Sequence, residues 1–389
     1  SAGGDQCIDT LVVGGGLSGS TAAFYLQQRG IDCRLAEANS QLGGNIISKS
    51  ENGFKWEEGP NSFQPTNEIL KLAKDLDMLE DLVLSDPSDP RYIYYDNKLQ
   101  ALPMSVQELI TSNLLSCAGK GKAVAGAMGF VSPKPKDKEE SIKEFACRHL
   151  GQEVFERVVD PFVSGIYAGD PDSLSMKAAL GKIQVLEDSG LTSSLVEGAI
   201  ASFLKNVTST SDEKDAPNGL PKVPSGSLGT FKNGMGSVLK KVSTIQRYLG
   251  PTTVKQSHEL VNLQKDGADW VSSFDTPTGE KTFRSKSVLL SMPAYAAAKV
   301  LSKARDGSAG VVPEAEILNS IRYPGVVSVT LAYPSNAFKV SKLKGFGHLI
   351  PRSMHIRTLG TIWTSSLFPG QAPDGYSTVR SFIGGASDP

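Results

Sequence analysis

A glycine-rich turn near the start of the chain limits the folds that it can adopt. Ile8–Val13 is a short run rich in β-branched residues, Gly14–Gly19 (Gly-Gly-Gly-Leu-Ser-Gly) interrupts it, and Ser20–Arg29 has the apolar spacing of a helix. A second short strand, Asp32–Ala36, follows and ends at Glu37. This order of strand, glycine turn, helix and strand forms one βαβ unit. It predicts a Rossmann-like domain that binds a dinucleotide.

The turn is predicted to hold the pyrophosphate of that cofactor through Gly14, Gly15, Gly16, Leu17, Ser18 and Gly19. Glycines permit the tight turn, the close approach of the phosphates to backbone N–H groups and the close packing of helix on strand. The N-terminus of the helix adds a favourable field for the anion. Glu37, at the end of the second strand, is expected to bind the ribose hydroxyls. The alternative is a glycine-rich turn without a ligand, and the flanking strand and helix argue against it.

FAD and NAD both fit this motif, whereas the Glu37 carboxylate would repel the extra phosphate of NADP. Gly43 and Gly44 follow shortly afterwards, and such a pair in FAD proteins of the amine-oxidase type lets the chain pass the cofactor phosphates. The sequence has no second Gly-x-Gly-x-x-Gly for a separate NADPH domain. The pattern therefore favours an oxidase that uses oxygen.

The composition excludes several other classes. Lys and Arg together number 40 against 41 for Asp and Glu, so the chain lacks the basic excess of a nucleic-acid-binding protein. Its apolar runs are shorter than the roughly 18 residues of a membrane-spanning helix. The four cysteines are scattered, which favours reduced thiols, and the four histidines form no close pair, so no metal site is predicted.

The composition and the spacing of apolar residues change several times along the chain, and these changes predict five segments. The segments are 1–86, an inserted helical unit at 87–200, a linker at 201–227, 228–293 and 294–389. Helices are expected at Asn67–Leu79, Val106–Leu115, Ser141–Leu150 and Glu153–Phe162. Strands of a second sheet are expected at Val326–Tyr333, Gly345–Ile350, Thr358–Thr364 and Thr378–Ile383.

A second group of motifs is far more specific than the glycine turn. Its members are Gly43-Gly44-Asn45, Trp56-Glu57-Glu58-Gly59-Pro60-Asn61-Ser62-Phe63, Asp89-Pro90-Arg91, Glu153-Val154-Phe155-Glu156-Arg157, Asp160-Pro161-Phe162-Val163-Ser164-Gly165, Tyr167-Ala168-Gly169-Asp170-Pro171, Leu174-Ser175-Met176-Lys177-Ala178-Ala179, Gly345-Phe346-Gly347, Leu359-Gly360-Thr361 and Phe368-Pro369. In these motifs the chain closely resembles the plant protoporphyrinogen IX oxidases, and the residues of the motifs are most similar to those of the plastid form. The resemblance runs from about Cys7 to Gly385.

The resemblance implies an amine-oxidase-like fold of α/β plus α+β class, with a Rossmann-like FAD-binding domain, an antiparallel-sheet substrate domain and an inserted helical unit. It implies that 1–86 and 228–293 are the two parts of an FAD-binding domain, that 87–200 serves membrane association and substrate, and that 294–389 is a substrate-binding domain. It implies FAD as the cofactor, a tetrapyrrole substrate and molecular oxygen as acceptor, with a hydride passing from a bridging carbon to flavin N5. It also implies a membrane-associated protein of the chloroplast, in the pathway to haem and chlorophyll. A homodimer is left open.

The family's cofactor positions fall on Gly14 to Gly19, on Glu37 and Ala38, and on Gly59, Pro60, Asn61 and Ser62, with an adenine contact expected near Glu259-Leu260. Its substrate positions fall on Arg91, Gly165, Leu349, Ile362 and Phe382. Arginine offers a planar fork of donors to a propionate carboxylate, and the aliphatic and aromatic side chains could hold pyrrole rings between them. Without the resemblance, a surface arginine, a helix cap at Gly165 and plain core residues are the alternatives. No general acid or base is predicted.

Two other interpretations stay open. One is a different flavoprotein of the same fold, such as an amine oxidase or a relative of the carotenoid desaturases. The other is an inactive shortened form, because the family continues beyond the position of Pro389 with a glycine-rich segment that touches the flavin. Part of the helical unit, including Leu109, Ile110, Leu114, Leu115 and Ala123–Val131, is expected either at a membrane surface or in a helical core.

Overall fold

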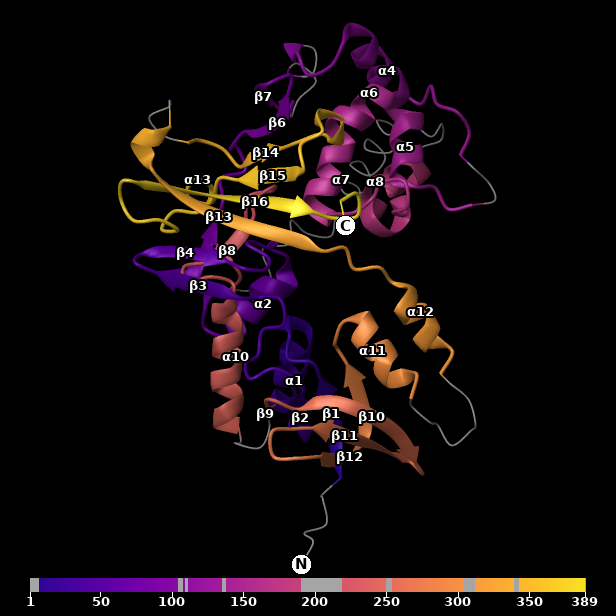
Figure 1. Ribbon diagram of the computed structural model, residues 1–389, viewed down its shortest axis with the longest axis vertical. Helices are drawn as coiled ribbons and strands as arrows, with labels where there is room; N and C mark the ends of the chain where they lie inside the picture. The colour runs from indigo at the N-terminus through magenta and orange to yellow at the C-terminus, as the bar shows by residue number, and fades with distance from the viewer. Residues whose placement is uncertain are drawn as a thin grey trace, which may run out of the picture. The chain divides into compact units, whose positions relative to one another are not determined.

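The chain divides into two compact units, each built from two separated stretches (Figure 1). The computed structural model describes residues 7–103, 108, 111–134, 138–189, 219–249, 254–303, 312–338 and 343–388. The first unit combines Ser1–Leu84 with Gly219–Tyr323, and the second combines Ser85–Asn218 with Pro324–Pro389. The expected linker, 201–227, lies mostly outside the described residues, and so do Val106, Gln107, Leu109 and Ile110 of the expected helix Val106–Leu115.

The first unit is organised by a mixed sheet with the strand order β10-β11-β12-β1-β2-β9. Its strands are β1 (Ile8–Val13), β2 (Cys33–Ala36), β9 (Val254–Lys255), β10 (Glu259–Asp266), β11 (Asp269–Asp275) and β12 (Lys281–Leu290). β1 pairs in parallel with β12 on one side and with β2 on the other, whereas β10, β11 and β12 are antiparallel. The parallel part is the βαβ arrangement that the sequence predicts.

β1 is central because both of its faces are apolar. Val13 packs into a cluster with Ile8, Leu11 and Phe274, and Val12 packs on the opposite side with Ala23 of α1 (Leu17–Gln28). Burial on both faces is typical of strands in parallel sheets. The helix expected at Ser20–Arg29 is confirmed, and it begins three residues earlier, directly after the glycine turn.

The first unit contains further helices and two strand pairs. They are α2 (Asn67–Asp75), α10 (Gly236–Leu249), α11 (Ala294–Leu301), α12 (Glu314–Ser320), the short 3-10 helix η1 (Leu79–Asp81), and the strand pairs β3 (Ser48–Glu51) with β4 (Phe54–Glu57) and β5 (Leu82–Leu84) with β8 (Gly229–Phe231). The helix expected at Asn67–Leu79 ends early, because Asp77 adopts the left-handed conformation with a φ of 55°. α11 contacts β10, so residues 294–323 lie with the first unit, although the substrate-binding domain was expected to begin at 294.

The second unit contains a sheet with the strand order β13-β16-β15-β14-β6-β7. Its strands are β6 (Arg91–Tyr95), β7 (Lys98–Ala101), β13 (Val326–Pro334), β14 (Gly347–Leu349), β15 (Thr358–Ile362) and β16 (Tyr376–Gly384). All neighbours are antiparallel except β14 and β6, which run in parallel. The four strands expected from the C-terminal sequence are confirmed as β13 to β16. The short helix α13 (Thr364–Leu367) and the 3-10 helices η3 (Ser335–Ala337) and η4 (Arg352–Met354) connect them.

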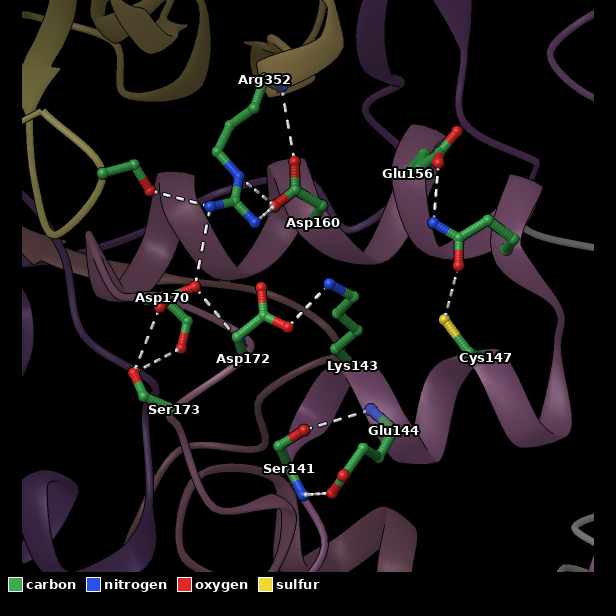
Figure 2. Close-up of polar contacts among 12 residues, drawn as sticks. Ser141, Lys143, Glu144, Cys147, Glu156, Asp160, Asp170, Asp172, Ser173 and Arg352 are labelled. Carbon is green, nitrogen blue, oxygen red and sulfur yellow. Dashed lines mark hydrogen bonds and ion pairs between the residues drawn. The ribbon is translucent and has the colours of Figure 1, made fainter.

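The helices of the second unit gather beside one end of that sheet (Figure 1). They are α4 (Cys117–Ala127), α5 (Ile142–His149), α6 (Gln152–Val154), the π-helix η2 (Phe155–Val159), α7 (Asp160–Tyr167) and α8 (Met176–Ser189). α5 begins with a capping box in which Ser141 and Glu144 satisfy each other's backbone N–H groups (Figure 2).

The stretch expected to be helical at Glu153–Phe162 is helical throughout, but not all of it is α-helix. The structure replaces its middle by the π-helical turn Phe155–Val159, and α7 starts directly after it. Pro161 explains the change, because it has no N–H to donate to a preceding carbonyl and its ring crowds the turn before it. A single π-helical turn inside a run of α-helix is often found at a functional site.

Candidate cofactor loop and candidate substrate wall

The loop between β1 and α1 depends on glycines at both ends. Gly14 has a φ of 108°, which side chains rarely adopt, and it lies against the backbone of Ser291. A Cβ on Gly19 would collide with the Gly14 carbonyl oxygen and with Ser291 Oγ. The Ser291 hydroxyl donates to the carbonyls of Gly14 (2.9 Å) and Val13 (3.1 Å), which fixes the turn where β1 ends. The sequence motif did not include Ser291.

The N-terminus of α1 is open toward a ligand. Its N-cap is Gly16, and no side chain accepts a hydrogen bond from the first turn. A Cβ built on Gly16 would meet nothing within 4 Å. The first N–H groups of a helix need acceptors, and the helix dipole favours an anion beside them. The loop therefore has the backbone donors and the free space that a pyrophosphate requires, with Leu17 and Ser18 as the first residues of the helix.

Glu37 ties the end of β2 to this loop. Its carboxylate is 6% exposed, and its Oε2 accepts a hydrogen bond of 2.6 Å from the Gly15 N–H. Its Oε1 accepts from the Asn39 backbone N–H and from Asn39 Nδ2, both at 2.8 Å. The sequence did not single out Asn39, although an Asx side chain directly after a strand end is a frequent local partner. His258 N–H donates to the Glu37 carbonyl, one residue before the expected adenine segment, and Ala38 is exposed beside it.

The next glycine pair along the chain meets the same loop. Gly43 N–H donates to the Gly15 carbonyl over 2.9 Å, and the Cβ position of Gly44 is 3.3 Å from Gly16 Cα. Gly59 lies so close to the Asn45 carbonyl that a side chain there would collide with it. The structure therefore packs Gly43 and Gly44 against the loop, and Gly59 against the neighbouring Asn45.

Asn61 contributes a buried donor beside Pro60 and Ser62 in the segment that follows Gly59. Asn61 Nδ2 has no hydrogen-bond partner among the described residues. Buried amide groups are nearly always paired, so an unpaired one indicates an acceptor that the protein itself does not supply. A bound flavin cofactor offers such acceptors on its ring and its phosphates. The residues of this unit therefore fit a flavin dinucleotide.

Glu57 is a structural residue that the sequence reasoning missed. It is 7% exposed; its Oε2 accepts from Ser48 Oγ (2.6 Å) and its Oε1 from the Met235 N–H (2.8 Å). Ser48 Oγ in turn accepts from the Gly236 N–H at 2.8 Å. The two side chains accept hydrogen bonds from the N–H groups at the start of α10. They thereby join both stretches of the first unit. The only signal in the sequence was a carboxylate inside a motif that otherwise matched the cofactor positions.

Four of the five predicted substrate residues share one face of the second sheet. The register places Arg91, Gly347, Ile362 and Arg380 opposite one another across β6, β14, β15 and β16. The next row, two residues along each strand, contains Ile93, Leu349, Gly360 and Phe382. Residues that stand directly opposite one another project from the same face. We call this face the substrate wall and define it by Arg91, Leu349, Ile362, Arg380 and Phe382.

The fifth residue, Gly165, lies on α7 against the substrate wall. A Cβ on Gly165 would collide with Leu349 Cδ2, so the absence of a side chain lets the helix approach the sheet. Gly165 is inside α7, and the helix ends at Ala168 in the left-handed conformation. The alternative of a helix cap at Gly165 is therefore wrong, because Ala168 has that position.

Two arginines stand at opposite ends of one row of the wall. Arg91 is half-buried, with its guanidinium 5.2 Å from the ring centroid of Phe346. Arg380 is 2% exposed; its Nε donates to Ser328 Oγ over 2.5 Å, and its guanidinium lies 5.0 Å from the Phe382 ring centroid. No sequence signal indicates a buried Arg380, because an arginine in an alternating strand is normally exposed.

The opposite face of this sheet is aromatic. Tyr92 packs on Trp363 with ring centroids 5.4 Å apart, and His348 lies 6.2 Å from the Trp363 centroid. Burial lowers the pKa of His348, so its neutral form is favoured. This aromatic layer covers one face of the sheet, and the substrate wall forms the other face.

Comparisons with known proteins agree with this geometry. A family model described as flavin containing amine oxidoreductase matches residues 17–389. Protoporphyrinogen oxidase 1, chloroplastic, of Arabidopsis thaliana is 38% identical over 98% of this chain and 70% of its own length. The chloroplastic protoporphyrinogen oxidase of Nicotiana tabacum is 38% identical over 98% of this chain and 68% of its own length.

A solved structure has the same fold. It is a provisionally named protoporphyrinogen oxidase from Exiguobacterium sp. 255-15, with a TM-score of 0.77, 21% identity, and coverage of 99% of this chain and 79% of that chain. The predicted amine-oxidase-like fold is thereby confirmed. The chain is an oxidoreductase that belongs to the flavin-containing amine oxidoreductase family and, within it, to the protoporphyrinogen oxidases.

Proposed function

We propose that this protein is an FAD-dependent oxidase that converts protoporphyrinogen IX to protoporphyrin IX, with molecular oxygen as acceptor and hydrogen peroxide as by-product. The observation that carries the proposal is the substrate wall, where a half-buried arginine shares one sheet face with Leu349, Ile362 and Phe382. A porphyrinogen matches such a face, because it is apolar in its middle and carries two propionates. The membership of this chain in the protoporphyrinogen oxidases supports the same reaction.

In this proposal the first unit holds the cofactor. The loop Gly14–Gly19 binds the pyrophosphate through backbone N–H groups, and Gly43 and Gly44 let the chain pass close to it. Glu37 holds the loop and offers its remaining lone pairs to the ribose. Asn61 donates its buried amide to the bound cofactor. Bound FAD would supply a two-electron oxidation in each cycle, so three cycles, each reducing one O2 to H2O2, would remove the six hydrogen atoms by which the porphyrinogen and the porphyrin differ.

The second unit orients the substrate. Arg91 binds one propionate through its planar fork, which fixes the rotation of the ring system. Leu349, Ile362 and Phe382 contact the pyrroles and exclude water, and Gly165 lets α7 pack directly against Leu349 at the edge of this site. No acid or base from the chain is required, since the pyrrole N–H protons can pass to solvent.

We also propose that the protein works at a membrane surface in the plastid. Leu114 and Leu115 are buried, which assigns that part of the helical unit to its core. Met128 and Phe130, at the end of α4, are 59% and 77% exposed and are the better candidates for insertion into a lipid surface. Among the described residues no helix is long and apolar enough to cross a membrane. Liposome flotation of a Met128→Ser, Phe130→Ser variant tests this part, and undiminished flotation would contradict it.

Kinetics on Arg91→Ala test the reaction and the wall together. A charged hydrogen bond contributes about 1.5–3 kcal/mol, so we expect KM for protoporphyrinogen IX to rise about 10- to 100-fold. The effect on kcat should be smaller, and the flavin content unchanged. The dimethyl ester lacks the carboxylate charge, so wild type and variant should oxidise it alike.

Equal impairment with acid and ester would mean that Arg91 is a structural residue. Wild-type protein that binds flavin but oxidises amines in place of the porphyrinogen would contradict the proposed function itself. The visible absorption spectrum of the purified protein reports the flavin independently of either outcome.

A further inference from the structure

An ion pair connects α7 to the 3-10 helix η4 (Figure 2). Asp160 is the first residue of α7, and Arg352 begins η4, three residues after the end of β14. Arg352 Nε donates to Asp160 Oδ1 over 2.6 Å, and its terminal nitrogen lies 2.5 Å from the same oxygen. The Arg352 backbone N–H points to Asp160 Oδ2 at 3.4 Å. The pairing therefore uses both the side chain and the main chain of one residue.

The pair is buried on the carboxylate side. The Asp160 side chain is 5% exposed and the Arg352 side chain 33% exposed. A buried carboxylate needs charged and hydrogen-bonded partners, so the position of Asp160 is coupled to that of the guanidinium. Arg352 also donates to Ser387 Oγ (2.9 Å) and lies 3.6 Å from Asp170 Oδ1. One guanidinium thus joins the start of α7, the turn after it and the segment after β16.

α7 is fastened at its far end as well. The Ala386 N–H donates to the Ala168 carbonyl over 2.8 Å, and Ala168 caps the helix. Between the two ends, Gly165 lies against Leu349. Leu349 and Arg352 are three residues apart, so the same short segment holds the helix by one apolar and one polar contact. A shift of the ion pair would therefore move Gly165 relative to the wall.

We propose that Arg352 and Asp160 are positioning residues that fix how α7 packs against β14, and thereby the shape of the substrate wall beside the contact of Gly165 with Leu349. The consequence for binding rests on the proposed function. Neither residue touches the substrate. Lysine would keep the charge at position 352 but replace the planar fork by a single point of attachment, which leaves the helix free to shift.

Hydrogen exchange tests the positioning without any activity. In Arg352→Lys we expect the amides of Asp160 and of residues 162–167 to exchange about tenfold faster than in wild type. Arg357→Lys is the matched control, since Arg357 makes a bidentate pair with Asp388 (2.6 and 2.8 Å) in the same region but is 75% exposed and does not touch α7. Equal exchange of these amides in the two variants would overturn the proposal.

Kinetics then test the consequence for the substrate. Arg352→Lys and Asp160→Asn should each raise KM for protoporphyrinogen IX about tenfold with kcat within about twofold, and Gly165→Ala added to Arg352→Lys should give a non-additive effect. Accelerated exchange with an unchanged KM would overturn the link to substrate fit and leave a structural ion pair. If wild type does not oxidise the porphyrinogen, the proposed function fails, and hydrogen exchange still decides the role of the pair.

Discussion

In the candidate cofactor loop the proposed roles depend on residues without a side chain, whereas in the candidate substrate wall they depend on side chains carried by separate strands. Gly14 and Gly19 allow two backbone segments to approach, and Gly16 leaves space beside a helix N-terminus. Arg91, Leu349 and Phe382 come from three strands and meet only because the register aligns them. A substitution at one of the loop glycines should therefore cause a large loss of stability or flavin binding. A substitution in the wall should change KM in small steps.

Gly19→Ala should have the largest effect. The added methyl group would collide with the Gly14 carbonyl, which cannot move without disturbing the end of β1. We expect a loss of stability on the order of 3 kcal/mol, together with loss of bound flavin, measured by urea unfolding and by absorbance. Gly16→Ala is the control, because its Cβ has free space, and its stability should match wild type. Two variants of equal stability would contradict this account of the turn.

Gly16→Asp should abolish flavin binding while leaving the fold intact. Its carboxylate would occupy the open space at the N-terminus of α1, where the pyrophosphate is proposed to lie. We expect flavin affinity to fall more than about 100-fold with little change in Tm, since an acidic residue at a helix start favours the helix. Gly16→Asn has similar bulk without the charge and should lose less. Full flavin content in Gly16→Asp would mean that the cofactor phosphates lie elsewhere.

Gly165→Ala should weaken substrate binding in a graded way. The new Cβ would meet Leu349 Cδ2, the end of a flexible side chain that can rotate away. We expect KM to rise several-fold, with a small change in Tm and no change in flavin content. Leu349→Val added to Gly165→Ala should restore part of the affinity by making room. An unchanged KM in the single variant would remove Gly165 from the substrate site.

The smallest effect concerns the aromatic face behind the wall. Burial lowers the pKa of His348, so the folded protein holds this proton less tightly than the unfolded chain does. Its contribution to stability is complete above the ordinary histidine pKa of about 6.5 and declines as the pH falls below it. Tm measured from pH 7.5 down to 5.5 should therefore fall less in His348→Gln than in wild type. Parallel curves would show that another group governs the acid sensitivity.

The cofactor loop and the substrate wall also differ in how much of their structure the sequence predicts. The sequence predicts Ile8–Val13, the glycine turn and the helix after it almost residue by residue, because hydrophobic period and glycine spacing are local signals. The break at Pro161 is local too, yet its form as a π-helical turn depends on the packing of α7. Boundaries between the two units were harder, since α11 belongs to the first unit through contacts with a distant strand.

From the sequence, the residues of the substrate wall could be identified only through the family resemblance. Nothing in an isolated strand shows that Ile362 stands opposite Arg380, because register is set by the whole sheet. The same limit hid Arg352 and Asp160, which are 192 residues apart and meet only when α7 packs on β14. Glu57 escaped notice for the same reason, since its partner Met235 is 178 residues away.

The pairing of β1 with β12 also sets a timetable for biosynthesis. Val12 of the central strand is matched to Leu289, which the ribosome adds only after the whole helical unit has been made. At about 5–20 residues per second, the nascent N-terminal strand waits roughly 15 to 55 s for this neighbour. During that interval an apolar strand with one unpaired edge is available to other chains. Molecular chaperones that bind extended apolar segments therefore have a defined period in which to protect the first residues of this protein.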